Sequence, residues 1–421
     1  MLKSNKGIVV TLTLALGLSA LAGCAASGSN TKSSAIRVIA QAGGPGEALK
    51  AAAIVYNKTH SAQVQVDLFD YDPVREKTVL GFSSGKVSYD VIGFDYAWMP
   101  QYVKSGYLTP LNDMATTQAS KINMGDFVKS YVDWATIDGK QYAMPWFGAV
   151  YMLYYRKDLL QQAGVAVPKT WEEYAQAAQT IQKKTGTTGT TLIGKRDDPL
   201  LDEFWSIAWS YGASITKDGK LSSMNSPEAA AAFAVWKKVL KSAPSDALSA
   251  DWPAAMASFS QGKTAMMINF SDTSDALLAA GSKVKDQVGF AALPAGPTGK
   301  STPNLGGWGL GVASNSKNQK EAFDFIAWAT SAEEQKAGLK NGGSASRISV
   351  LKDPQVQLQY PYYAAALENY NNSIFFPVTS RWVDWEAAMS PPLSSALSGQ
   401  ITTAEAFKQA STRLDAEMAK G

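Results

Sequence analysis

Short apolar runs alternate with amphipathic helical segments along the chain from residue 36 onward. The first pair is the apolar run Ile36 to Ala40, followed by the glycine-rich turn Gly43 to Gly46 and by Leu49, Ala53 and Tyr56 at helical spacing. A short apolar run bounded by a turn predicts a buried strand, and residues three or four apart predict one helical face. This alternation predicts an α/β fold.

The remaining strands and helix starts are expected at regular intervals. Strands are expected at Val64 to Leu68, Val91 to Phe94, Gln141 to Met144, Ala149 to Tyr155, Ala265 to Ile268 and Leu310 to Ala313. Several helix starts carry a hydroxyl residue followed three positions later by Glu or Gln, the pair that forms a reciprocal cap. These pairs are Thr170 with Glu173, Ser316 with Gln319, Ser331 with Glu334 and Thr402 with Glu405, and Ser226 before Pro227 marks another start.

The first residues predict export and lipid anchoring. Lys3 and Lys6 precede an apolar run from Ile8 to Leu21, which predicts a signal peptide over residues 1–23. A run of about 14 residues is too short to cross a bilayer core, which needs about 20. Cys24 is the only cysteine and follows Gly23, as in a bacterial lipobox. We therefore expect two acyl chains on Cys24, a flexible tether over residues 24–35, and an extracytoplasmic protein held at the membrane.

Residue usage excludes several functions. A single cysteine excludes an intrachain disulfide, and the only histidine, His60, makes a hydrolytic triad or a zinc centre hard to assemble. No cofactor is expected, because the glycine-rich stretches at residues 296–301 and 307–312 lack the spacing of nucleotide-binding loops. Removing Lys3 and Lys6 takes the formal charge from +3 to +1, and no stretch of the sequence clusters Lys or Arg with aromatic residues, so nucleic acid is not expected as a partner.

Paired carboxylates offer the one route to an enzyme. Asp197 with Asp198, and Asp202 with Glu203, could flank a glycosidic bond as acid and base or nucleophile. Adjacent carboxylates more often belong to a solvated loop. A lipid-anchored glycoside hydrolase therefore stays open as the alternative to a binding protein.

Aromatic residues favour a carbohydrate ligand. The chain has 12 tryptophans, of which Trp171, Trp236 and Trp328 fall on helical apolar stripes and are expected in the core. Six others lie beside glycine, proline or carboxylate residues: Trp98, Trp146, Trp205, Trp308, Trp382 and Trp385. An aromatic ring can cover the C–H face of a sugar while polar side chains bind its hydroxyls. For each of these six, core packing and ligand contact both remain open.

Four groups of residues together resemble the extracellular solute-binding proteins of the maltose-binding type. They are residues 90–111, residues 138–145 with 153–159, residues 259–269, and residues 306–308 with 316–318 and 347–350. The resemblance implies a type II periplasmic-binding-protein fold, in which a hinge joins two α/β lobes around a ligand cleft. It places lobe one at residues 36–146 and 310–345, and lobe two at 147–309 and 346–421.

The resemblance also implies a set of ligand-binding residues. They are Gln41, Gly44 and Glu47 after the first strand, then Asp95, Trp98, Trp146, Asp202, Glu203, Asp272, Trp308, Arg347, Arg381, Trp382 and Trp385. Asp272 could instead cap the following helix. Ala149 stands where maltose binders carry glutamate, which argues against maltodextrin as the ligand.

The function implied is that of the binding subunit of an ABC importer, and not of an enzyme. It would act as a monomer that captures a sugar or polyol and delivers it to the membrane permease. A second alternative keeps the fold and changes the ligand to another kind of solute.

Overall fold

The computed structural model describes residues 35–86, 88–117 and 122–420. The expected signal peptide, the lipidated Cys24 and nearly all of the expected tether lie outside these residues. Within the described part of the chain, no helix combines the length and hydrophobicity needed to cross a membrane.

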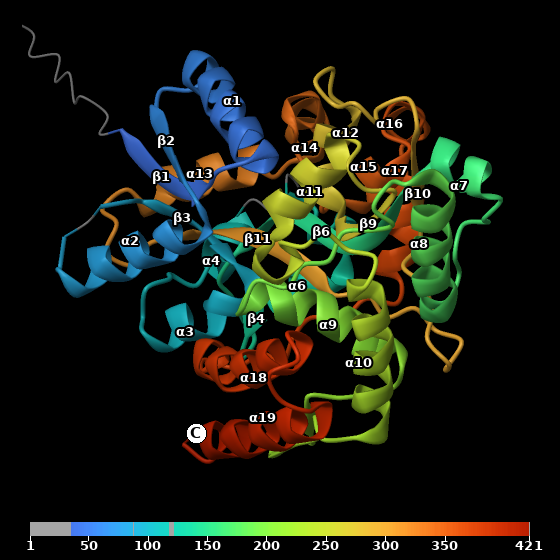
Figure 1. Ribbon diagram of the computed structural model, residues 1–421. Helices are drawn as coiled ribbons and strands as arrows, with labels where there is room; N and C mark the ends of the chain where they lie inside the picture. Colours follow the sequence, from blue (N-terminus) through green and yellow to red (C-terminus); the bar gives the residue numbers. More distant parts are fainter. Residues whose placement is uncertain (1–34, 87, 118–121, 421) are drawn as a thin grey trace, which may run out of the picture. The chain divides into compact units, whose positions relative to one another are not determined.

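A seven-stranded sheet lies at the centre of the described chain (Figure 1). Its strand order is β10-β6-β11-β3-β1-β2, and β9 also pairs with β6. Strands β1, β2 and β3 are mutually parallel, whereas β6, β9, β10 and β11 pair antiparallel. The strands are β1 (Ile36–Gln41), β2 (Val64–Phe69), β3 (Val91–Asp95), β6 (Met144–Arg156), β9 (Met266–Phe270), β10 (Val288–Ala291) and β11 (Leu305–Val312). Two small hairpins are formed by β4 (Thr136–Ile137) with β5 (Lys140–Gln141) and by β7 (Thr216–Lys217) with β8 (Leu221–Ser222).

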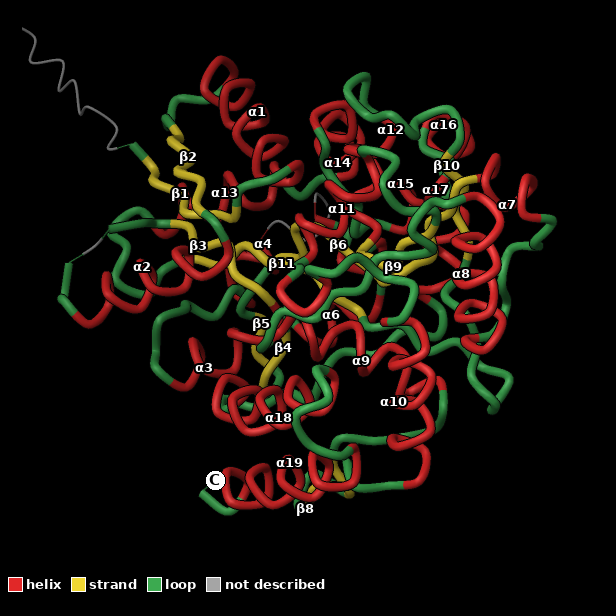
Figure 2. Tube along the Cα trace, in the orientation of Figure 1, coloured by secondary structure: helices red, strands yellow, loops and turns green. Residues whose placement is uncertain are grey.

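Helices cover this sheet, as the tube view in Figure 2 shows. The first half of the chain contributes α1 (Gly44–Thr59), α2 (Tyr71–Ser83), α3 (Met99–Lys104), α4 (Asn112–Thr117), α6 (Lys129–Trp134), α7 (Lys157–Ala163), α8 (Trp171–Thr185) and α9 (Asp198–Ser210). The second half contributes α10 (Pro227–Leu240), α11 (Trp252–Ser260), α12 (Ser274–Leu278), α13 (Gln319–Ala329), α14 (Ala332–Gly338), α15 (Ile348–Leu351), α16 (Pro354–Gln359), α17 (Tyr362–Tyr370), α18 (Trp382–Leu397) and α19 (Thr403–Met418). Short 3-10 turns are η1 (Tyr96–Trp98), η2 (Met124–Asp126), η3 (Ala247–Ser249), η4 (Ser271–Thr273) and η5 (Leu339–Asn341).

Strand β6 is longer than its sequence pattern predicts. The expected strand at Gln141 to Met144 is wrong as a single element, because Gln141 ends β5 and Met144 begins β6. The first half of β6 pairs with β11, and its second half pairs with β9 and β10. One strand thus joins the β2-β1-β3-β11 side of the sheet to the β9 and β10 side.

Four of the five predicted helix starts are capped by the expected hydroxyl, and at Thr170 the predicted reciprocal cap is complete. The Thr170 hydroxyl accepts the amide of Glu173, whose carboxylate accepts the Thr170 amide, which completes a capping box. Ser226, Ser331 and Thr402 each accept an amide three residues on. The prediction at Ser316 is wrong: its hydroxyl donates to the Asp90 carboxylate at 2.6 Å, and α13 begins later, at Gln319.

Candidate functional site

The candidate site begins where two parallel strands end. β1 ends at Gln41 and β3 ends at Asp95, and both strands pair side by side. In open α/β sheets, ligands bind beyond the carboxyl ends of such strands. Helix α1 starts directly after β1, and no side chain caps its first turn. Its start fits closely because Gly44 and Gly46 have no side chain: a Cβ atom there would lie 2.4 Å from the Gly342 carbonyl and 2.1 Å from the Gln41 carbonyl.

The middle of β6 and β11 forms one wall. Trp308 on β11 pairs in register with Asp95 on one side and with Phe147 on the other. The register slips by one residue beyond this point, because Gly309 pairs with Pro145 and Trp146 has no partner on β11. Phe147 and Ala149 are two residues apart, so their side chains lie on the same face of the strand, and this face lines the cavity.

Helices α9 and α11 and the turn after β9 complete the enclosure. Asp198 and Asp202 are four residues apart on α9, so they lie on one helical face. Trp252 begins α11, and its indole donates to the Tyr151 hydroxyl at 3.1 Å. Asp272 lies in η4, where no side chain caps α12.

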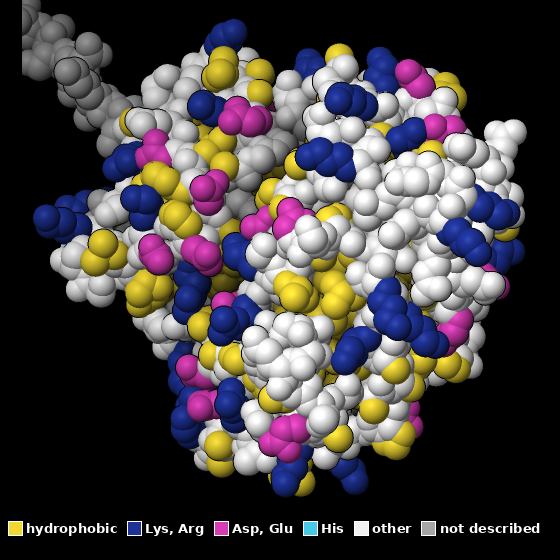
Figure 3. Space-filling model, in the orientation of Figure 1, with side chains coloured by type: hydrophobic (Ala, Val, Ile, Leu, Met, Phe, Trp, Pro, Cys, Tyr) yellow, Lys and Arg dark blue, Asp and Glu magenta, His cyan; other side chains and the backbone are white. Residues whose placement is uncertain are grey.

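These elements enclose a cavity of about 250 Å³. Its polar lining comes mainly from Gln41, Asp95, Asp198, Asp202, Asn269, Asp272 and Thr273, and its aromatic lining from Tyr71, Tyr96, Phe147, Trp252, Phe270 and Trp308. Tyr71, Asp198 and Trp252 also line a larger outer groove of about 770 Å³. Figure 3 shows the visible face hollowed near its middle, where hydrophobic side chains appear between acidic and basic ones.

Four carboxyl groups of the cavity have raised pKa values. Burial raises the pKa of Asp95 and of Asp202 well above the ordinary value, and the charge of Asp198 raises both further. Burial also raises the pKa of Asp198, and it raises the pKa of Asp272 to about 6. These shifts reflect the cost of burying the ionised form of each carboxyl group, and a protonated carboxyl group can donate as well as accept a hydrogen bond. Among the described residues, no group of three or more His, Cys, Asp or Glu could hold a metal ion.

Tyr71 connects the aromatic and acidic parts of the cavity. Its ring centroid lies 4.7 Å from that of Trp98 and 5.9 Å from that of Trp308. Its hydroxyl donates to the Asp198 carboxylate at 2.8 Å. Such a group offers a hydrophobic ring surface beside oriented polar atoms, which suits a sugar-like ligand.

The structure gathers half of the residues expected to bind ligand. Gln41, Gly44, Asp95, Asp202, Asp272 and Trp308 line the cavity, and Trp98 lines the outer groove. Glu47 is exposed on α1, outside the cavity wall. The other six expected residues also lie outside it: Trp146, Glu203, Arg347, Arg381, Trp382 and Trp385.

Most of these outlying residues have partners within the protein. Glu203 accepts the Trp236 indole at 2.9 Å and the Ile193 amide at 2.8 Å. Trp382 donates to Asp198 at 3.2 Å, so it contacts the cavity only through that carboxylate. Arg381 pairs with Glu417 near the C-terminus. Trp385 is buried on α18, where its indole N–H has no partner among the described residues.

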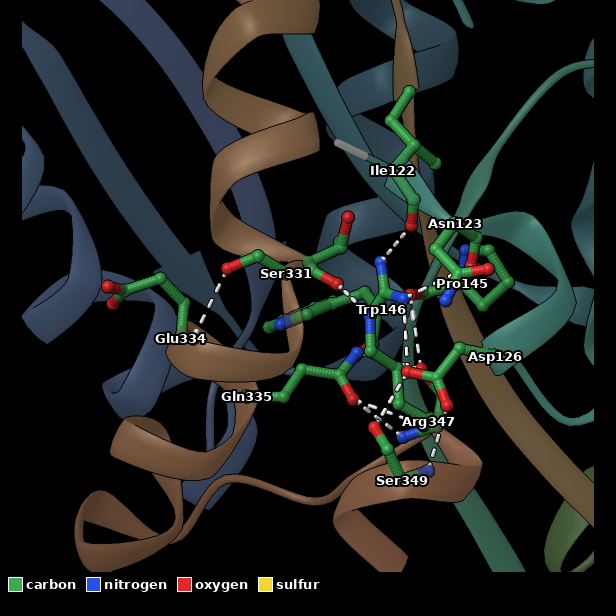
Figure 4. Close-up of polar contacts among 12 residues, drawn as sticks. Ile122, Asn123, Asp126, Pro145, Trp146, Ser331, Glu334, Gln335, Arg347 and Ser349 are labelled. Carbon is green, nitrogen blue, oxygen red and sulfur yellow. Dashed lines mark hydrogen bonds and ion pairs between the residues drawn. The ribbon is translucent and has the colours of Figure 1, made fainter. Parts of the chain in front are cut away.

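Of these outlying residues, Arg347 makes several contacts with other parts of the protein (Figure 4). Its guanidinium donates to the carbonyl oxygens of Thr330 and Ile122 at 2.6 and 2.7 Å. It also pairs with Asp126 at 3.3 Å and lies 3.9 Å above the Phe127 ring. Figure 4 shows Trp146 beside this group, and its carbonyl oxygen accepts from Gln335 at 3.1 Å.

Several cavity residues were not predicted from the sequence. Tyr71, Tyr96, Phe147, Trp252, Asn269 and Phe270 line the cavity but are absent from the predicted ligand-binding set, although Tyr96 and Asn269 lie within segments that carry the family resemblance. Asp198 had been expected in a solvated loop. That expectation is wrong, because Asp198 begins α9 and accepts hydrogen bonds from Tyr71 and Trp382. Asp198 precedes Pro199, and proline is common in the first turn of a helix, so the sequence does contain a signal for a helix start here.

Comparison with known proteins identifies the family. Residues 28–336 match the family model described as bacterial extracellular solute-binding protein. The chain belongs to this family. A relative, a probable ABC transporter-binding protein of Deinococcus radiodurans, is 33% identical over 295 residues, which cover 68% of this chain and 70% of that protein.

Solved structures of the family share the fold. An ABC transporter solute-binding protein of Agrobacterium radiobacter K84 in complex with ribitol is 25% identical, with a TM-score of 0.84 over 91% of this chain and 98% of that one. The maltose-bound MalE3 protein of T. maritima is 27% identical, also with a TM-score of 0.84, over 91% of this chain and 100% of that one. The predicted type II periplasmic-binding-protein fold is thus confirmed.

Proposed function

We propose that this protein is the binding subunit of an ABC importer and captures a carbohydrate or polyol in the cavity. The observation that carries this proposal is one enclosed space that joins six aromatic residues to four carboxyl groups. Aromatic faces and carboxyl groups match the two sides of a polyhydroxylated ligand. The ribitol and maltose named for the two similar structures belong to this ligand class.

Capture would proceed by closure of two lobes about a hinge. We propose the lobes at residues 36–146 with 310–345 and at 147–309 with 346–421. Ligand favours the closed state only through contacts that the open state lacks. The closed form then docks on the permease, and a lipid on Cys24 keeps the protein at the outer side of the membrane.

A glycoside hydrolase remains the second candidate, because the structure brings carboxyl groups together. Asp95, Asp198 and Asp202 line the same cavity, and burial raises the pKa of each. A raised pKa is what a catalytic acid requires. The binding proposal differs in that the sugar leaves the cavity chemically unchanged.

The test is calorimetric titration of the purified full chain with monosaccharides, polyols, disaccharides and longer glycans. Each mixture is afterwards examined by chromatography for hydrolysis. We expect saturable binding of at least one of these compounds and its recovery intact. If a glycan is hydrolysed and the Asp202→Asn variant no longer hydrolyses it, the protein is a glycoside hydrolase and the binding proposal is wrong. Binding of none of these compounds would refute the carbohydrate assignment.

A further inference from the structure

Among the described residues, the cavity is lined by acidic side chains and by no basic one. Its described lining includes Asp95, Asp198, Asp202 and Asp272, and no Lys, Arg or His residue. Of the two adjoining spaces, the outer groove does have basic side chains in its described lining, namely Arg75, Lys195 and Arg196. Of these, Lys195 already pairs with Asp251 at 3.2 Å. The four carboxyl groups therefore lack a counter-charge beside them in the cavity.

The hydrogen bonds to three of these carboxyl groups come from neutral donors. Asp95 accepts the Ala97 amide at 2.8 Å, and Asp202 accepts the side-chain amide of Asn304. Asp198 accepts the Tyr71 hydroxyl at 2.8 Å and the Trp382 indole at 3.2 Å. Neutral donors reduce the cost of burying a carboxylate, but they do not cancel its charge. Asp198 and Asp202 also repel each other across one turn of α9.

The aromatic walls favour the same kind of ligand charge. Tyr71, Trp252 and Trp308 line the cavity, and the centroid of the Tyr71 ring lies 6.0 and 5.9 Å from those of the two tryptophans. The faces of aromatic rings carry negative potential and attract cations. An anionic ligand would be repelled by ionised carboxyl groups and by the negative potential of these ring faces.

Another part of the lining offers backbone hydrogen-bond donors in place of carboxyl groups. Residues 43–46 form the uncapped start of α1 and line the cavity. Amide groups in the first turn of a helix suit acceptor oxygens. A ligand with a cationic group at one end and hydroxyl groups elsewhere would satisfy both regions.

We infer that the ligand is a polyhydroxylated compound with a protonated amine, an amino sugar or amino polyol, whose ammonium lies among Asp95, Asp198 and Asp202. The inference rests on the proposed function and narrows its ligand class. The ammonium supplies the missing positive charge, and its N–H groups donate to the carboxylates. The hydroxyl groups bind the remaining polar atoms, including those at the start of α1.

The experiment compares ligands that differ only at the amine. The full chain is titrated by calorimetry at neutral pH with sorbitol and 1-amino-1-deoxysorbitol, and with glucose, glucosamine and N-acetylglucosamine. We expect an amine to bind at least tenfold more tightly than its hydroxyl or acetylated counterpart. Equal or tighter binding of the neutral compounds would overturn the inference and leave the proposed function standing. If no compound of either class binds, the proposed function itself fails.

Two variants test the position of the amine. Asp202→Asn keeps an acceptor for Asn304 and removes one charge, and Asp95→Asn keeps the cap on Ala97. In each variant we expect the ratio of amine affinity to neutral-counterpart affinity to fall tenfold or more. Asp286→Asn, at an exposed position remote from both pockets, is the matched control and should leave the preference unchanged. A preference that persists in both cavity variants would overturn the inference.

Discussion

Arg347 carries a charge deep inside the protein, where its side chain is 2% exposed. Its donors hold together residues that are far apart in the sequence, including Ile122 and Thr330. Removing one member of a buried ion pair leaves the partner's charge and polar atoms unsatisfied, which costs several kcal/mol. Its role is therefore expected in folding stability and not in ligand contact.

Arg347→Met should lower the free energy of unfolding by about 3 kcal/mol or more and leave ligand affinity unchanged. The matched control is Arg381→Met, because Arg381 pairs with Glu417 and Asp384 near the surface. A surface pair contributes about 1 kcal/mol or less. Denaturant unfolding and calorimetry measure the two quantities. A loss of affinity in Arg347→Met without a loss of stability would contradict this assignment.

Glu203 should make stability depend on pH. Burial raises its pKa from 4.5 to about 8 in the folded chain, so the folded state binds this proton more tightly than the unfolded state. The stabilising contribution is complete below the unfolded pKa and is lost as the pH rises through about 8.

Glu203→Gln removes this titration and one of the two acceptor oxygens. We expect the variant to be less stable than the native chain at pH 5, by about 1–3 kcal/mol, with the difference shrinking or reversing at pH 9. Denaturant unfolding at both pH values measures it. Glu368→Gln, on the exposed side of α17, is the control and should show no such trend. A difference that stays constant with pH would refute the prediction.

At the scale of elements, the sequence predicts most of the strands and helix starts but not the course of β6. Pro145 and Gly148 interrupt the apolar pattern, which suggests two elements. The chain nevertheless forms one strand: Pro145 pairs with Gly309, and the bulge leaves Trp146 without a partner on β11. The same bulge directs Phe147 toward the cavity, whereas Trp146, a residue of the predicted ligand-binding set, lies outside the cavity wall. Partners such as Glu203 with Trp236, or Arg347 with Ile122, depend on tertiary packing that no local pattern reports.

The start of α1 depends on close backbone contact, which Gly44→Ala should disturb. The added Cβ would lie 2.4 Å from the Gly342 carbonyl oxygen, so the helix start must move. We expect a loss of about 1–3 kcal/mol in stability and weaker ligand binding, because the first turn of α1 lines the cavity. Gly281→Ala is the control, since a Cβ there meets no atom within 4 Å. Unchanged affinity in Gly44→Ala would show that the helix start does not contact ligand.

At the scale of the whole molecule, the cavity is assembled from segments distant in sequence. Tyr71 begins α2 and Asp198 begins α9, 127 residues later, and their side chains meet at the edge of the cavity. In the proposed division these residues belong to different lobes. A hydrogen bond that exists only in the closed state stabilises closure and thereby raises ligand affinity.

Tyr71→Phe tests this coupling, because it removes only the hydroxyl that donates to Asp198. A hydrogen bond to a charged acceptor contributes about 1.5 kcal/mol or more, so affinity should fall about tenfold or more. Stability without ligand should hardly change if the open form lacks the bond. The control Tyr211→Phe removes a comparable bond to Glu172, and both residues lie within proposed lobe two. It should lower stability slightly and leave affinity intact. If instead Tyr71→Phe lowers stability without ligand and leaves affinity unchanged, the hydrogen bond exists in both the open and the closed state. It then does not favour the closed state.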